Sequence, residues 1–264
     1  IVIDEQHRFG VGQRLALREK GVNEAEHPHQ LIMTATPIPR TLAMTAYADL
    51  DSSIIDELPP GRTPVETAVV PDHRREEVIA RVHAAAAQGQ QAYWVCPLIE
   101  ESEVLDIQAA TDTAEHLNAA LPDLSVGMVH GRLKTAEKDQ VMSAFLSHEI
   151  DVLVATTVIE VGVDVPNASL MVIENAERLG LSQLHQLRGR VGRGTQRSVC
   201  VLLYQAPLSR MAKERLAVIR NTTDGFEIAQ RDLELRGPGE VLGTRQTGLA
   251  QFRIADLHRN RSLL

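Results

Sequence analysis

The 264-residue sequence has no apolar run near the roughly 18 residues that a membrane-spanning helix needs, and no signal peptide opens it. Internal repeats and low-complexity segments are also absent. Cysteine is scarce, with Cys96 and Cys200 alone, and both lie in apolar, strand-like runs. We therefore expect reduced core cysteines in a cytosolic protein, with neither a disulfide nor a metal-binding pair.

An initiator methionine is missing as well. Ile1-Val2-Ile3 reads as a strand that starts the chain abruptly and runs directly into Asp4 and Glu5. A strand with polar, chemistry-bearing residues at its carboxyl end is expected to have other elements before it. We interpret the sequence as a piece of a longer protein.

Basic residues are fewer than acidic ones, with 27 Lys and Arg against 35 Asp and Glu, so the net charge is −8. The distribution is uneven, however. Residues 1–182 carry 13 Lys and Arg against 28 Asp and Glu, whereas residues 183–264 carry 14 against 7. This asymmetry predicts contact with a polyanion near the C-terminal third of the chain.

The hydrophobic content of 44% and the charged content of 23% are typical of a globular protein. Short apolar runs alternate with longer amphipathic or Ala-rich segments, which predicts an α/β fold with parallel sheets flanked by helices. The expected strands are 1–3, 30–35, 65–70, 91–99, 125–130, 151–156, 169–174 and 198–204. The expected helices include 40–48, 73–88, 110–120, 135–147, 182–188 and 208–221.

Three segments are expected in the chain organisation. The sequence DELPPGRTP (56–64) predicts a hinge, because three prolines and a glycine break any regular element. It separates residues 1–60, the C-terminal part of one α/β domain, from residues 61–205, a complete second one. Residues 206–264 are predicted to form a helical hairpin followed by the Gly-rich loop GPGEVLGTRQTG.

Polar residues follow two of the expected strands near the start of the chain. Asp4 and Glu5 end the first strand, where adjacent carboxylates can share metal-assisted hydrolysis. The alternative is ordinary surface charge. Thr34 and Thr36 end the second strand and can bridge neighbouring loops by hydrogen bonds, or simply form a turn before Pro37.

A third polar group lies in ATTVIEVGVDVPNA (155–168). Thr156 and Thr157 end a strand, where hydroxyls and backbone N–H groups suit phosphodiester oxygens. Gly162 and Asp164 follow, where a turn and a carboxylate could meet a ribose or the water shell of a metal ion. A strand-turn-strand with ordinary polar ends is the alternative.

Arginines concentrate in QLHQLRGRVGRG (183–194). The spacing predicts one short helical stretch carrying Gln186, Arg188, Arg190 and Arg193, with Arg190 and Arg193 on a shared face. Guanidinium groups bind phosphate well, and an arginine finger adds about 10³–10⁵ to a phosphoryl-transfer rate. The alternative is a solvated, arginine-rich loop.

The order of these groups resembles motifs II, III, V and VI of the superfamily 2 helicases. The resemblance implies two RecA-like domains with ATP between them. Asp4 would then hold Mg²⁺ through water, and Glu5 would be the catalytic base. Gln186, Arg190 and Arg193 would reach the γ-phosphate from the second domain.

The remaining residues take their roles from the same resemblance. Gly162 and Asp164 would face the nucleotide. Residues 95–102 and 129–134 look like motifs IV and IVa. Residues that would contact DNA, or link hydrolysis to its movement, are His7, Thr34, Thr36, Thr156 and Thr157.

The segment 34–64 and the tail DLELRGPGEVLGTRQTG resemble the RecG family of bacterial branched-DNA helicases. The tail is similar to a translocation motif shared with the transcription–repair coupling factor Mfd. The resemblance implies that Arg215 on the hairpin, with Arg236 and Gln246 in the loop, passes domain closure to duplex DNA. The DEQH tetrad and the GTRQTG ending favour RecG.

Two features of the family pattern are missing from the sequence. It has no G-x-x-x-x-G-K-[ST] phosphate loop, and no oligonucleotide-binding wedge module precedes motif II. The resemblance implies that the parent protein uses ATP and Mg²⁺ to remodel forks and Holliday junctions. It also implies a monomer in the bacterial cytoplasm, associated with the nucleoid. The isolated chain is expected to be inactive. Mfd, or a non-catalytic DNA-binding or interaction module for the isolated chain, are the alternatives.

Overall fold

The computed structural model describes residues 1–4, 16, 29–33, 51, 53–55, 57, 64–97, 103–156, 165–194 and 196–236. Within them the chain has the predicted α/β fold. Each of the eight predicted strands is found. The predicted helix over 40–48 lies outside the described residues.

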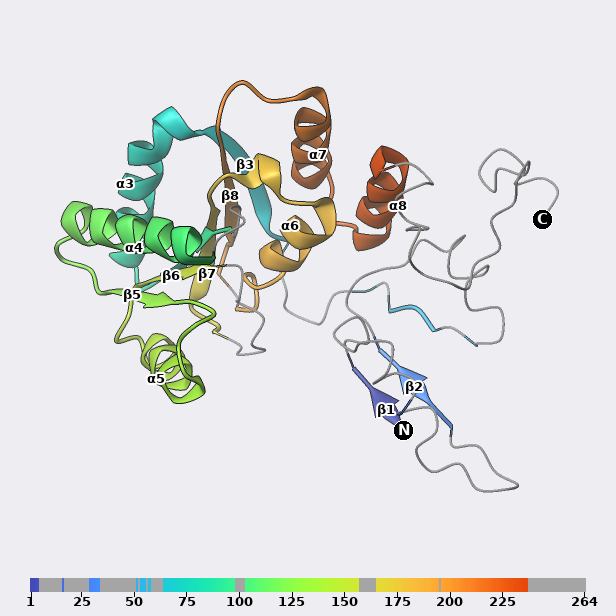
Figure 1. Ribbon diagram of the computed structural model, residues 1–264, viewed down its shortest axis with the longest axis horizontal. Helices are drawn as coiled ribbons and strands as arrows, with labels where there is room; N and C mark the ends of the chain where they lie inside the picture. The colour runs from blue at the N-terminus through green and yellow to red at the C-terminus, as the bar shows by residue number, and fades with distance from the viewer. Residues whose placement is uncertain are drawn as a thin grey trace.

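The main sheet has six parallel strands in the order β3-β8-β7-β4-β6-β5 (Figure 1). All six carboxyl ends therefore lie at one edge, where open α/β sheets bind ligands. The strands are β3 (Glu66–Pro71), β4 (Gln91–Cys96), β5 (Val126–Val129), β6 (Val152–Thr156), β7 (Ala168–Ile173) and β8 (Val199–Tyr204).

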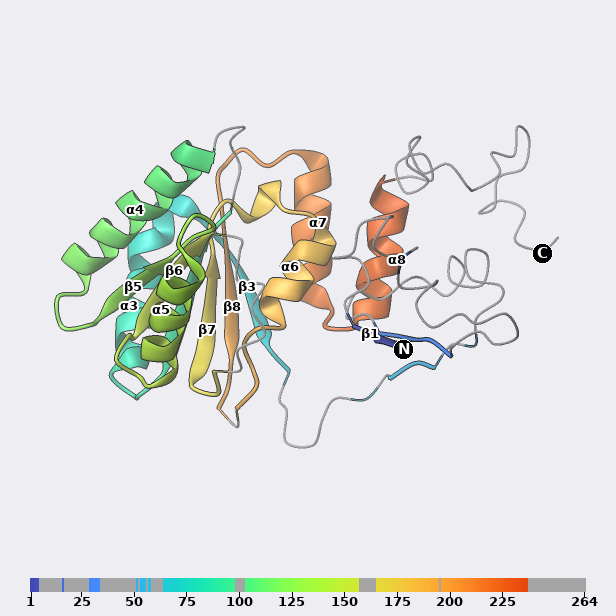
Figure 2. The same ribbon diagram turned by 60° about the horizontal axis from the view of Figure 1, so that its bottom comes forward.

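Helices cover both faces of this sheet, which gives three layers (Figure 2). One apolar cluster joins the sheet to α3 (Arg75–Ala86) and α4 (Glu103–Ala120). The other joins it to α5 (Thr135–Leu146), α6 (Leu181–Arg188), α7 (Arg210–Asn221) and α8 (Gly225–Arg236). The predicted hairpin thus shares the core of the sheet domain.

The central strand β4 shows why the sheet needs two covers. Its residues alternate between the two clusters: Trp94 and Cys96 pack with α3 and α4, whereas Tyr93 and Val95 pack on the opposite face. The Tyr93 ring meets Phe145 of α5 edge to face, with centroids 5.0 Å apart. A strand buried on both faces reads as a continuous apolar run, which explains the sequence pattern.

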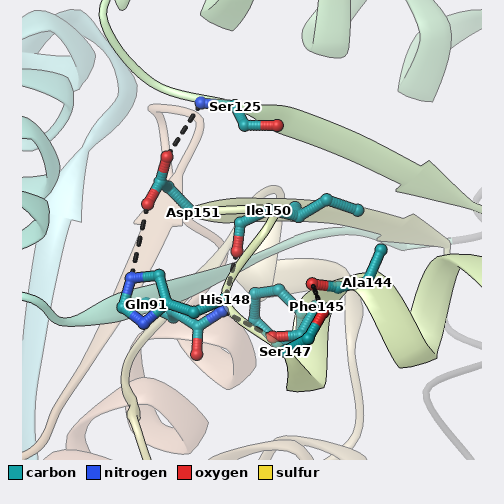
Figure 3. A network of polar contacts seen from close by, with 8 residues as sticks. All are labelled: Gln91, Ser125, Ala144, Phe145, Ser147, His148, Ile150 and Asp151. Carbon is teal, nitrogen blue, oxygen red and sulfur yellow. Dashed lines mark hydrogen bonds and ion pairs between the residues drawn. The ribbon is translucent and has the colours of Figure 1, made fainter.

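A polar network closes the amino-terminal edge of the sheet (Figure 3). The buried Gln91 amide nitrogen donates to the carbonyl oxygens of Phe145 at 2.6 Å and Ile150 at 2.7 Å. Asp151 accepts from the Ser125 backbone N–H at 2.9 Å. These bonds fix the turn between α5 and β6, where His148 has a positive φ of 64°.

Near the start of the chain, β1 (Val2–Ile3) and β2 (Leu31–Ile32) form a separate parallel pair. Val2 is level with Leu31 and Ile3 with Ile32, and the Met33 N–H donates to the Ile3 carbonyl at 2.7 Å. The ends of the two strands therefore lie side by side. Asp4 follows directly after β1 at this edge.

The two cysteines lie in the apolar clusters on opposite faces of the sheet. Cys96 and Cys200 are free and buried, as predicted. Burial raises the pKa of the Cys200 thiol to about 12, so both the charge and the reactivity of that side chain are suppressed. In the part of the chain that the structure describes, no helix has the length and apolarity that crossing a bilayer requires.

Candidate functional site

The arginine-rich segment begins on α6. Gly180 precedes the helix, and its backbone N–H donates to the Gln183 side chain at 3.0 Å, which satisfies one open donor of the first turn. Leu181, Leu184 and Leu187 bury one face of the helix against the core. Gln186 lies on the opposite, exposed face.

The prediction of one helical stretch through residue 193 is wrong. Helix α6 ends at Arg188, and Gly189 caps it. Gly192 has a φ of 78°, which a helix cannot contain, so Arg190 and Arg193 lie on the turn that follows and not on a shared helix face. The positions of the glycines, and not the spacing of the arginines, therefore predict where this helix ends.

The Arg188 side chain points into the core. Only 3% of it is exposed, and its Nη1 donates to the carbonyl oxygens of Ile219 at 2.6 Å and Thr222 at 2.9 Å. Burial lowers the pKa of Arg188. This arginine joins α6 to the end of α7, a role that sequence reasoning missed because burial cannot be read from an Arg-Gly-rich pattern.

His185, one turn earlier on α6, faces the same guanidinium. Its Nδ1 lies 3.2 Å from Arg188 Nη2. Burial, and then the Arg188 charge, lower the pKa of His185 to about 4. The ring is therefore neutral at physiological pH, and its Nδ1 lone pair can accept from Arg188.

At the carboxyl end of β6, Thr156 is 1% exposed, and its hydroxyl has no hydrogen-bond partner among the described residues. A buried hydroxyl without a partner costs stability, and the contact of Thr156 with a ligand stays a prediction. Thr157, Gly162 and Asp164 lie outside the described residues.

In the first segment, Asp4 is exposed just beyond β1. Since β1 and β2 are parallel and in register, Asp4 and Met33 lie at the same edge of this pair. Predicted site residues outside the described part of the chain are Glu5, His7, Thr34 and Thr36.

The hairpin helices begin with regular caps. Ser209 accepts from the Ala212 N–H at 3.2 Å at the start of α7, and Asp224 accepts from the Phe226 N–H at 2.8 Å at the start of α8. Arg215 of α7 donates to the Glu177 carbonyl at 2.6 Å, in the short helix η3 (Ala176–Arg178) that precedes α6.

For two of the predicted residues, Arg236 and Gln246, the structure does not describe the side chain. Arg236 is the last residue of α8, and its side chain lies outside the description, as does all of Gln246. Nothing in the described part of the chain therefore tests their predicted contact with DNA.

A charged group at the carboxyl edge of the sheet was not predicted. Glu174, just after β7, pairs with Arg75 at 2.6 Å and accepts from Trp94 Nε1 at 2.7 Å. The Arg75 guanidinium lies 5.5 Å from the Trp94 ring centre. These three side chains fix the start of α3 against β4 and β7.

Metal ligation was predicted only through Asp4. Among the described residues, no group of three or more His, Cys, Asp or Glu side chains could hold a metal ion. A single exposed carboxylate at the end of a parallel strand fits an ion held mainly by water and phosphate oxygens.

Sequence comparisons assign the class of this arrangement. The profile of the "Helicase conserved C-terminal domain" matches residues 74–195, and that of "ATP-dependent DNA helicase RecG, domain 3, C-terminal" matches residues 222–264. The parallel sheet and the motif VI segment thus define a helicase C-terminal domain of RecA-like fold.

Individual relatives narrow the class. The chain is 69% identical over its whole length to the ATP-dependent DNA helicase RecG of Escherichia coli strain K12, and 67% identical to that of Pasteurella multocida. A solved structure of RecG bound to a three-way DNA junction is 46% identical, covers 99% of the chain and has a TM-score of 0.74. The chain belongs to the RecG family.

The chain spans 38% of the length of these two curated relatives, and 33% of the chain in the solved structure. The similarity therefore covers about a third of the length of each of these relatives.

Proposed function

We propose that the protein containing this chain is an ATP-dependent double-strand DNA translocase that remodels branched DNA, by fork regression and Holliday junction branch migration. The observation that carries this proposal is the 69% identity, over the entire chain, to an ATP-dependent DNA helicase RecG. The related RecG structure with a three-way junction supports branched DNA as the substrate.

The proposed organisation is the predicted one. Residues 1–60 belong to the first RecA-like domain, residues 61–205 form the second, and residues 206–264 form the hairpin and translocation loop. Nucleotide binds between the two RecA-like domains, as is common for sites at domain boundaries. The match over 222–264 favours RecG over the coupling factor Mfd for the last segment.

In the proposed site the first domain supplies carboxylates. Asp4 holds Mg²⁺ through water, and Glu5 orients and deprotonates the attacking water. When bound, Mg²⁺ neutralises charge on the phosphate oxygens. Arg190 and Arg193 complete the pocket from the second domain, with Gln186 on the exposed face of α6 beside them.

Other residues face the nucleotide or the DNA. Gly162 and Asp164 line the nucleotide side of motif V. The residues proposed to contact DNA, or to link hydrolysis to its movement, are His7, Thr34, Thr36, Thr156, Thr157, Arg215, Arg236 and Gln246. The protein is proposed to act as a monomer in the bacterial cytoplasm, close to the nucleoid.

The arginine role is tested by Arg193→Ala in the full-length protein. Loss of a finger should lower ATP turnover on branched DNA by about 10³-fold or more. Arg197→Ala is the matched control, since Arg197 is exposed and its guanidinium pairs with the Glu66 carboxylate at 2.6 Å. Wild-type turnover in Arg193→Ala would reject the assignment.

The translocation loop has a different test. Gln246→Ala should reduce junction unwinding more than ATP hydrolysis, because the side chain is proposed to transmit motion and not to contact phosphate. Both rates are measured on the same three-way junction. An equal loss of both would contradict the coupling role.

The isolated 264-residue chain is proposed to bind DNA without hydrolysing ATP, because it has no phosphate loop. An ATP titration of this chain should show no micromolar binding, and such binding would contradict the proposal. DNA affinity should fall with salt at a slope of roughly −0.9 per phosphate contact on duplex. A salt-independent interaction would favour a protein-binding module instead.

A further inference from the structure

Arg188 is the point where the motif VI helix meets the hairpin. Its Nη1 lies within hydrogen-bond distance of three oxygens: the carbonyls of Ile219 and Thr222, at 2.6 and 2.9 Å, and the Thr67 hydroxyl of β3, at 3.3 Å. Ile219 lies in the last turn of α7, and Thr222 follows directly. One side chain of α6 thus closes the carboxyl end of α7.

The environment of this charge is unusual. Arg188 is buried, and in the described part of the chain no carboxylate forms an ion pair with it. Carbonyl groups at the end of a helix carry partial negative charge and can balance a cation there. Because a buried charge is expensive without such partners, Arg188 must keep these carbonyls close for the domain to remain packed.

A second polar contact fastens the other end of α6. Ser182 Oγ donates to Asp232 Oδ2 of α8 at 3.2 Å. Between the two contacts, Leu184 and Leu187 pack in the same cluster as Ile219 and Ile228. Helix α6 is therefore held by α8 at its start and by α7 at its end.

We propose that Arg188 is a positioning residue that makes α6 and the hairpin move as one body, so that displacement of the motif VI arginines displaces α7 and α8. Arg190 and Arg193 follow Arg188 by two and five residues. A shift of that turn on nucleotide binding is passed through α6, whose end is fixed to α7. This inference rests on the proposed function.

A purely structural role for Arg188 predicts a different result. If it only stabilises the domain, a variant loses ATP hydrolysis and unwinding in parallel, as folded protein is lost. If Arg188 couples α6 to the hairpin, the variant still binds and hydrolyses ATP, but it unwinds fewer base pairs for each ATP molecule hydrolysed. The number of ATP molecules consumed per base pair unwound separates these cases.

The experiment compares Arg188→Met and Arg188→Lys in the full-length protein. Methionine keeps most of the side-chain length without donors, and lysine keeps the charge without the forked geometry. Arg197→Met is the control, since Arg197 is exposed and pairs with Glu66 on the surface. ATP hydrolysis and unwinding of one three-way junction are measured in the same reaction, with thermal unfolding recorded for each variant.

Both Arg188 variants are expected to bind ATP within twofold of wild type and to consume at least fivefold more ATP per base pair, while the control is unchanged. An unchanged ratio in both would overturn the proposal. If Arg188→Met fails to fold, Arg188→Lys together with Ser182→Ala decides the question by the same ratio. Failure of the proposed function itself would look different, because wild-type protein would then show no ATP hydrolysis dependent on branched DNA.

Discussion

Gly194 lies against Pro166 so closely that a Cβ atom at residue 194 would be 2.5 Å from the Pro166 carbonyl oxygen. Pro166 belongs to the segment 155–168, which resembles motif V, and Gly194 ends the segment 183–194, which resembles motif VI. The contact therefore joins the backbones of the two segments that we propose to reach the nucleotide. Because the obstacle is a backbone atom, a side chain at residue 194 cannot be accommodated by a rotamer change.

Gly194→Ala is expected to move the turn that carries Arg190 and Arg193. Misplacement of a catalytic group by 1 Å costs about 10²-fold in rate, so ATP turnover of the full-length protein should fall by about tenfold or more. Gly189→Ala is the control for stability: its φ is −66°, and the nearest atoms to its Cβ are 3.4 Å away. The prediction fails if Gly194→Ala hydrolyses ATP at the wild-type rate.

His185 should make the stability of the domain depend on pH. Burial and the Arg188 charge lower its folded-state pKa to about 4, from an ordinary value of 6.5. Between these values the unfolded chain binds more protons, so this contribution to stability is complete above about pH 6.5 and is lost as the pH falls toward 4. We expect a loss of about 1–2 kcal/mol between pH 7 and pH 5 from this group.

The measurement is urea unfolding of the chain at both pH values, followed by the fluorescence of Trp94, which is fully buried and the sequence's single tryptophan. His185→Gln should flatten the pH dependence, because glutamine does not titrate. His83→Gln, at an exposed position of α3, should leave it unchanged. Identical pH profiles for wild type and His185→Gln would show that the ring titrates normally in the folded state.

Much of the fold was predictable because the central strands β4, β6 and β7 are buried on both faces. Continuous apolar runs such as the one around Trp94 can be recognised without knowing what covers them. The predicted start of α4, at residue 110, is later than the observed start at Glu103. The first turn exposes Val104 and Leu105 and buries Asp106, so it lacks the apolar face, repeating every three to four residues, by which an amphipathic helix is recognised. The strand order needed the structure, since every order of six parallel strands has the same sequence pattern.

The candidate site was predictable by motif but not by geometry. Arg188, Arg190 and Arg193 are equivalent in a spacing argument, yet one is buried against α7 while the others follow on a turn. The difference arises from Gly189 and Gly192, and from the hairpin that packs beside α6. The Arg75–Glu174 pair was missed because its partners come from segments about 100 residues apart.

Gln91 should contribute strongly to stability, because its amide nitrogen satisfies two carbonyl groups in the turn before β6 (Figure 3). Gln91→Ala leaves both unpaired in a buried site, and we expect a loss of about 2–4 kcal/mol in the free energy of unfolding. Gln88→Ala is the control at an exposed position in the preceding turn and should change stability by less than about 0.5 kcal/mol. Equal unfolding midpoints in urea, read from Trp94 fluorescence, would contradict this role.

Thr156 and Ser169 offer a matched pair for separating ligand contact from folding. Both hydroxyls are buried, and neither has a hydrogen-bond partner among the described residues. Thr156 ends β6 at the carboxyl edge of the sheet, whereas Ser169 lies at the opposite end, near the start of β7. Removing either hydroxyl removes an unsatisfied polar group, so Thr156→Val and Ser169→Ala should each leave stability unchanged or slightly raised.

The two substitutions, Thr156→Val and Ser169→Ala, should differ in their effect on DNA binding. If the Thr156 hydroxyl contacts a phosphate, Thr156→Val weakens binding of a three-way junction by about fivefold to tenfold, the equivalent of about 1–1.4 kcal/mol for one hydrogen bond. Ser169→Ala should bind the junction as wild type does, because its end of the strand faces away from the site. Fluorescence anisotropy with the full-length protein at fixed salt measures both, and equal affinities for the two variants would remove Thr156 from the DNA-binding residues.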